Sequence, residues 1–344
     1  MRKYEEKLTE SFDFNKASKV LQKAKLFTLI RTVIVSLVVF TLLGGTLVVL
    51  NAMMLNRIAT KELINEYLFD SVARPNIYQV QYQITNGFFA GELKSVTHRI
   101  VGNRPVYNGT FRIDFGLIPL FTGTYGAGRG QLNRIEVANG YRYYNKAGQR
   151  EMIFFHPFIE YQIYPNDLAL LEAIGGDKYL EMALSFDRDY SFEEVQAMLP
   201  GEVKIAWFWV DTYNQGDLAG MKGHYADRIG YDGKPTGEKV YLPPRYLHAN
   251  RVYGMKGLSL DGEIIDDPRR FFIEAINTGR KREGRYQLQF KKLHTELSND
   301  KGEIEKDDLR IIGVVVTGDA ASMRLLQAKN FIKAASLGIV IDKY

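Results

Sequence analysis

The architecture of this chain is decided by residues 32–55, TVIVSLVVFTLLGGTLVVLNAMML, which contain no charged side chain and are flanked by Arg31 and Arg57. As an α-helix rising about 1.5 Å per residue, this run can cross a hydrocarbon core about 30 Å thick with some tilt. A cleaved signal peptide is the rival interpretation, and Leu50-Asn51-Ala52 resembles a cleavage site. Signal peptides, however, have apolar regions of only about 7–15 residues. We therefore predict an uncleaved transmembrane helix over residues 32–55.

The flanking charges predict the orientation of this helix. Residues 1–31 hold eight Lys and Arg side chains against four Asp and Glu, whereas residues 56–75 hold three of each sign. Basic residues in short flanking segments stay in the cytoplasm. We expect the N-terminal tail inside the cell, at the cell membrane, and residues 56–344 outside.

Composition narrows the functions that the large C-terminal part can have. Most of the net charge of +5 comes from the tail, so this part lacks the basic excess that nucleic-acid binding requires. The chain has no cysteine, which excludes disulfides, thiolate metal sites and a cysteine nucleophile. A cysteine-free outer part of this size is typical of a bacterial surface protein. We expect no direct contact with nucleic acid.

The tail itself has the pattern of an amphipathic helix. Its lysines occupy the remaining surface around one apolar stripe. Two interpretations stay open: the helix lies on the membrane surface, or it docks the stripe in a groove of a partner protein. The stripe consists of Phe14, Ala17, Val20, Leu21 and Ala24.

After the apolar run, helical and strand patterns alternate, which predicts an α+β fold. Residues 56–74 are expected to be helical, with Ile58, Leu63, Tyr67 and Val72 as packing positions. Short strands follow, with turns expected at Asn86-Gly87, Asn108-Gly109 and Asn139-Gly140. We predict five regions: a cytoplasmic tail (1–31), a transmembrane helix (32–55), a juxtamembrane helix (56–75), a β-rich extracellular region (76–180) and a mixed α/β C-terminal domain (181–344).

Within the last region, several local patterns are specific. Residues 203–213, VKIAWFWVDTY, predict a central strand buried on both faces, with Val203, Ile205, Trp207 and Trp209 on one of them. Ser191 and Glu194 are spaced as a capping box, and Asp319 is placed to cap a late helix.

We find no catalytic pattern in the sequence. The five histidines have no metal-ligand spacing, and no nucleophile-elbow motif is present. Asp211 follows the aromatic strand, where a hydrogen-bonded strand terminus is the simpler interpretation than a catalytic acid. We therefore expect no enzyme activity, no cofactor and no metal site.

Three stretches together resemble the sigma-factor regulator family of Gram-positive bacteria. They are KASKVLQKAKLFTLIRTVIVSLVVF at residues 16–40, YSFEEVQAMLPGEVKIAWFWVDTY at 190–213, and the closing region from GVVVTGDAASMRLLQ to FIKAASLGIVIDKY. The resemblance implies an anti-sigma factor that sequesters an extracytoplasmic-function (ECF) sigma factor at the membrane through its tail. The outer domain would then sense or transmit the state of the envelope.

The tail departs from the better-known anti-sigma factors, which often use a helical cytosolic domain, sometimes with a His/Cys zinc motif. Here the tail is short and lacks cysteine. This leaves room for a second membrane protein that completes the interaction. An alternative of a different class is a membrane-anchored envelope-binding or structural module without a sigma partner, and an anchored envelope enzyme is a third.

Overall fold

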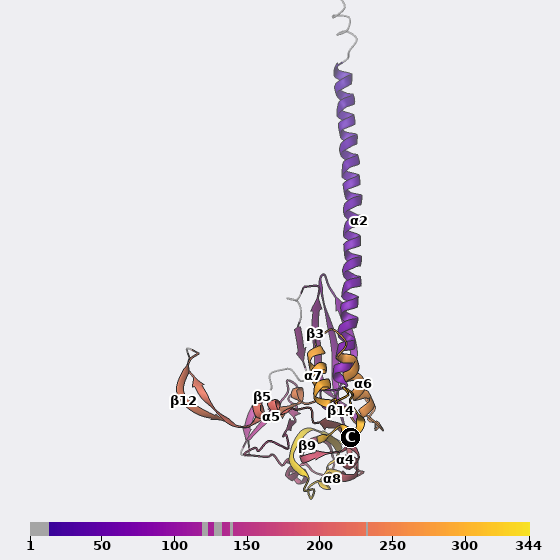
Figure 1. Ribbon diagram of the computed structural model, residues 1–344. Helices are drawn as coiled ribbons and strands as arrows, with labels where there is room; N and C mark the ends of the chain where they lie inside the picture. Colours follow the sequence, from indigo (N-terminus) through magenta and orange to yellow (C-terminus); the bar gives the residue numbers. More distant parts are fainter. Residues whose placement is uncertain (1–13, 119–122, 127–132, 138–139, 232) are drawn as a thin grey trace, which may run out of the picture.

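The computed structural model describes residues 14–118, 123–126, 133–137, 140–231 and 233–344 (Figure 1). One helix dominates its N-terminal part: α2, Phe14–Asp70. Residues 14–31 of the tail, the apolar run and residues 56–70 after it are therefore parts of one continuous helix, although the sequence suggested separate regions. Figure 1 shows α2 as a single rod that extends far beyond the domain in which the C-terminus lies.

Burial changes sharply along α2. Every side chain from Lys19 to Leu50 is exposed, and the helix is long and apolar enough to span a membrane. Burial begins with Asn51, Leu55 and Ala59, which face the protein. The free and packed parts of the helix therefore meet at residue 51.

The packed part of α2 lies against an antiparallel sheet of four strands in the order β1-β2-β3-β4. Leu55 and Ala59 form a small core with Leu93, Phe111 and Phe115 of this sheet. The strands are β1 (Ile77–Asn86), β2 (Ala90–Val101), β3 (Arg104–Gly116) and β4 (Gly123–Gly126).

The turns of this sheet correct one prediction. Asn86-Gly87 does form the turn between β1 and β2. Asn108-Gly109 instead lies inside β3, and the chain reverses at Gly102-Asn103. Gly109 has φ +135°, which lets β3 bulge opposite Thr97 and continue as a strand. Of the third predicted turn, Asn139 lies outside the described residues.

A second antiparallel sheet forms the centre of the C-terminal part, with the strand order β14-β10-β15-β9-β16. Both of its faces are buried: one under the helices and the end of α2, the other under the segment around Phe154 and Phe155. Its strands are β9 (Lys178–Tyr190), β10 (Lys204–Val210), β14 (Gly254–Lys256), β15 (Ile311–Asp319) and β16 (Ile332–Asp342).

Strand β10 is central and buried on both faces, as predicted, but its alternation is interrupted. Trp207 and Trp209 point to one face of the sheet. Val203 lies on the other face, together with Phe208 and Val210. The pairing of β10 with β15 shifts between Ile205 and Trp207, which marks a β-bulge. One extra residue in a strand moves every later side chain to the other face of the sheet. The prediction that Val203 and Ile205 share a face with Trp207 and Trp209 is therefore wrong.

The remaining elements cover the sheet or connect its strands. The helices and 3₁₀ turns are η2 (Asp167–Leu170), α3 (Leu171–Ile174), α4 (Phe192–Met198), α5 (Gln215–Met221), η3 (Ala249–Arg251), α6 (Arg269–Gly279), α7 (Gln287–Leu297), η4 (Lys306–Asp308) and α8 (Ala320–Arg324). The short strands are β5 (Asn133–Val137), β6 (Gly140–Tyr144), β7 (Arg150–Glu151), β8 (Ile153–Phe154), β11 (His224–Ile229), β12 (Pro235–Leu242) and β13 (Leu247–His248).

The predicted fold class is confirmed: a long apolar N-terminal helix precedes several antiparallel sheets in a mixed α+β arrangement. Two predictions of helix caps are also confirmed. Ser191 and Glu194 form the capping box at the start of α4, and the Asp319 side chain caps α8. Figure 1 also shows the hairpin that contains β12 projecting away from the domain.

Candidate functional site

The predicted partner-binding stripe lies on the free part of α2. Val20 and Leu21 are 65% and 60% exposed, Ala24 is exposed and Ala17 is half-buried. Phe14 begins the helix, and its side chain lies outside what the structure describes. At about 100° per residue the described members of the stripe share one side of the helix, so an apolar surface is available for a partner or a lipid.

At its other end α2 is joined to the domain by buried charges. The Arg74 guanidinium donates to Glu66 (Nη2–Oε2, 2.6 Å) and to Asp70 (Nη1–Oδ1, 3.3 Å). The Tyr286 hydroxyl also donates to Glu66, and Lys256 pairs with Asp70. Burial works against the charged form of Arg74, but the two carboxylates outweigh it and hold the pKa of Arg74 above its ordinary value. This network joins the helix end to Tyr286, the residue just before α7, and to β14.

A second buried network joins the two sheets. Arg99 of β2 is fully buried and pairs with Glu151 (Nη2–Oε2, 2.7 Å) and Glu181 (Nη1–Oε1, 2.7 Å). Asn108 accepts from Arg99 Nε at 2.9 Å, and Asn76 donates to Glu181 at 2.6 Å. Glu181 lies on β9, so this cluster connects the four-stranded sheet to an inner strand of the five-stranded one. Removing one partner of such a pair leaves a buried charge uncompensated.

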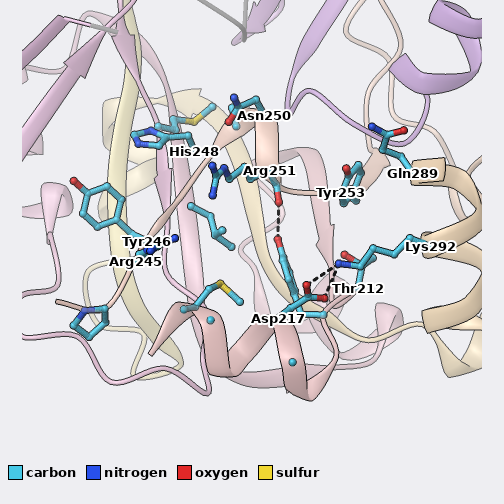
Figure 2. A pocket seen from close by; sticks show the side chains of 18 of the residues that line it. Thr212, Asp217, Arg245, Tyr246, His248, Asn250, Arg251, Tyr253, Gln289 and Lys292 are labelled. Carbon is cyan, nitrogen blue, oxygen red and sulfur yellow. Dashed lines mark hydrogen bonds and ion pairs between the residues drawn. The ribbon is translucent and has the colours of Figure 1, made fainter. Parts of the chain in front are cut away.

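The C-terminal part also contains an open cleft of about 1270 Å³ (Figure 2). It lies between α5, the segment 242–251 and one side of α7. Figure 2 shows Lys292 of α7 reaching Asp217 of α5, a pair at 2.7 Å. Tyr213 and Arg251 also line the cleft, and the Tyr213 hydroxyl donates to the Arg251 carbonyl at 2.9 Å.

The cleft combines aromatic and cationic side chains. Tyr246 and His248 lie on one wall, close to Arg245 and Arg251 (Figure 2). Burial and the nearby Arg251 charge lower the pKa of His248. The tyrosine faces and the arginines of the cleft suit an anionic or aromatic ligand.

Asp211, which the sequence offers as a candidate catalytic acid, has hydrogen-bond partners within the protein. Among the described residues no group of three His, Asp or Glu side chains is placed to hold a metal. Asp211, at the end of β10, accepts from the Tyr213 amide at 3.2 Å and lies 3.5 Å from the buried His156 Nε2. It is thus a hydrogen-bonded strand terminus, the simpler of the two interpretations.

The contacts between the helix end and the domain do not follow from the sequence pattern. Tyr67, expected as a packing position, is 67% exposed, whereas the adjacent Glu66 is completely buried. A glutamate facing a core contradicts the apolar periodicity on which the prediction was based. Leu63, by contrast, packs partly and Val72 completely, as predicted.

These features define a protein with a helix capable of spanning a membrane, an exposed apolar stripe near the start of that helix, and an α+β domain packed against its other end. Comparison with family models agrees with the resemblance noted in the sequence. Residues 18–106 match the model described as "Sigma factor regulator N-terminal", and residues 171–339 match "Sigma factor regulator C-terminal". No curated protein and no solved structure matches the chain.

The two models cover most of the chain, and the chain belongs to the sigma factor regulator family. This family is regulatory rather than catalytic, and its domains imply a sigma factor as partner. The N-terminal model begins at residue 18 and includes the exposed Val20 and Leu21.

Proposed function

We propose that this protein is a single-pass anti-sigma factor of the Gram-positive type, which holds an ECF sigma factor at the membrane through the stripe at the start of α2. The observation that carries the proposal is the exposure of Val20 and Leu21 on a helix that continues directly into the apolar run. An exposed apolar stripe framed by lysines suits a groove on a partner protein. Binding there keeps the sigma factor from RNA polymerase.

In this proposal the N-terminus is cytoplasmic and residues 56–344 are extracellular. The basic tail supports that orientation, because positive charge in short flanks remains inside. Lys16, Lys19 and Lys23 can in addition contact anionic lipid headgroups. A second membrane protein can complete the contact with the sigma factor, since only a short helix is available inside.

The extracellular domain then senses or transmits envelope state. Support comes from the cleft, which offers cationic and aromatic groups to a ligand, and from the buried Glu66–Arg74 pair at the end of α2. Because α2 is one continuous helix, a displacement of the end that packs on the domain also moves the apolar stripe at its start. Such a ligand acts only if it binds two arrangements of the domain with different affinity.

The central test is a single charge in the stripe. We expect Leu21→Asp to abolish recovery of the sigma factor with the detergent-solubilised protein and to raise transcription from its target promoters. A carboxylate at the centre of an apolar contact costs the several-kcal/mol range typical of interface anchors, about 2–4 kcal/mol.

The matched control is Gln22→Asp. It places the same charge one residue further along the helix, where the side chain is exposed and lies off the stripe. Equal loss of sigma binding in both variants would point to a general charge effect, and wild-type binding by Leu21→Asp at normal protein level would refute the stripe as the contact.

A second candidate function is an envelope-binding or structural module that the helix merely anchors. The open cleft favours it independently of the tail. Deleting residues 1–20 while keeping the apolar run separates the two: a regulator loses its effect on transcription, whereas an external module keeps its binding.

A further inference from the structure

The turn between β1 and β2 carries an apolar surface with no partner within the described part of the chain. Phe88 and Phe89 are 58% and 39% exposed, and their rings contact edge to face at 4.5 Å. The Leu117 amide donates to the Phe89 carbonyl at 2.9 Å, and the next residue, Ile118, is 43% exposed. We name Phe88, Phe89 and Ile118 the apolar tip.

The apolar tip is fixed to one level of α2. Asn51 Nδ2 donates to the Gly87 carbonyl at 3.0 Å, and the Phe89 amide donates to Asn51 Oδ1 at 2.9 Å. Asn51 is only 7% exposed, and Leu55, one turn further, is buried in the core of the sheet. Figure 1 shows this sheet standing alongside the domain end of α2.

That level coincides with the end of the lipid-compatible part of the helix. All side chains of residues 32–50 are exposed and uncharged. Nineteen residues at about 1.5 Å each give about 28 Å, close to a hydrocarbon core of about 30 Å. Asn51 is then the residue at which the helix leaves the hydrocarbon, and the apolar tip lies beside it.

We propose that the apolar tip inserts into the boundary between headgroups and acyl chains of the same membrane that α2 spans. The occupant is lipid, because the helix that holds the tip in place also places it at bilayer depth, where aromatic side chains are favoured. The proposal rests on the proposed membrane anchoring. It gives the domain a second attachment, which limits its tilt relative to the helix and sets the distance of the cleft from the membrane.

The absence of cysteine from the chain allows a clean test with single labels. Full-length Phe88→Cys, carrying an environment-sensitive fluorophore, is reconstituted into phosphatidylcholine–phosphatidylglycerol vesicles with quenchers at defined acyl-chain depths. Val39→Cys, inside the apolar run, reports the spanning helix. Phe271→Cys, an exposed phenylalanine of α6, is the matched control.

We expect quenchers near the headgroups to remove most of the emission at position 88, quenchers deep in the chains to act at position 39, and only aqueous iodide to act at position 271. Ile118→Cys should behave like Phe88→Cys, which guards against a local effect of one substitution.

Two outcomes would overturn the proposal for the apolar tip and still agree with a membrane-spanning α2. In one, position 39 is quenched by lipid and position 88 is open to iodide like position 271. In the other, position 88 is shielded from both lipid and iodide, which places a protein on the tip. If lipid quenchers do not act at position 39, the proposed membrane anchoring is refuted, and the insertion of the apolar tip is refuted with it.

Discussion

At the scale of single residues, the charges that matter most in this chain are buried ones. Glu66 and Arg74 are almost fully enclosed, and the positive φ of Arg74 turns its side chain back toward the helix it has just left. Arg74 also lies over the Phe111 ring at 4.5 Å, so one guanidinium joins the helix end to the first sheet. The buried charges stabilise the junction only while each of them keeps its partner.

Glu66→Gln should therefore be strongly destabilising. The change leaves Arg74 buried with Asp70 as its remaining carboxylate, and losing one member of a buried pair costs about 3–5 kcal/mol. Chemical unfolding of the detergent-solubilised protein measures this. The exposed pair between Arg228 and Glu238 provides the control, since Glu238→Gln should change the free energy of unfolding by less than about 1 kcal/mol. Equal effects of the two substitutions would contradict the prediction.

His248 should make the domain sensitive to acid. Its folded-state pKa is lowered, so the unfolded chain binds the proton more readily, and stability falls as pH drops below the ordinary histidine pKa of about 6.5. We expect the thermal midpoint to fall less between pH 7 and pH 5 in His248→Gln than in the wild type. His224→Gln, at an exposed histidine, should retain the wild-type slope. An unchanged slope in His248→Gln would show that other groups control the acid response.

At the scale of elements, close approach decides which strands can pair. Strand β14 meets β10 at Gly254, where an added Cβ would lie 1.9 Å from the Phe208 carbonyl oxygen. The edge of the five-stranded sheet therefore requires glycine at this position, although nothing in the local sequence distinguishes it from other glycines.

Gly254→Ala should force β14 away from β10 and cost about 1–3 kcal/mol by overpacking. The displacement also disturbs Lys256 and its pair with Asp70 of α2. Gly176→Ala is the matched control, because nothing lies within 4 Å of its added methyl group. Thermal unfolding compares the two, and a wild-type midpoint for Gly254→Ala would mean that the strands separate freely.

At the scale of the whole molecule, the end of the helix and the domain share one hydrophobic core. Phe69, Val72 and Ala73, at and just after the end of α2, are part of the main core together with Tyr286 and Phe290. A boundary placed after residue 75 would therefore remove part of that core.

We expect a fragment of residues 51–344 to unfold cooperatively and a fragment of residues 76–344 to lack a cooperative transition. The shorter piece loses Phe69, Val72 and the Glu66–Arg74 pair, and exposes the surfaces that they cover. Circular dichroism against temperature distinguishes them. A cooperative transition of equal midpoint in both fragments would show that the helix end is dispensable.

The sequence alone determined the features that arise locally. A run without charge predicts a spanning helix because unpaired charges are excluded from hydrocarbon, and the capping box at Ser191 works through neighbours three residues apart. The apolar stripe of the tail also follows from helical spacing, and its role as the partner contact stays a prediction.

Only the tertiary structure decided which parts meet. The bulge in β10, the strand through Asn108-Gly109, the burial of Glu66 and the fixing of the Phe88-Phe89 turn to Asn51 depend on residues far apart in the chain. Such contacts leave no periodic signal in either partner. The burial of Glu66 and the contacts of Asn51 arise because buried polar groups need partners wherever the fold places them.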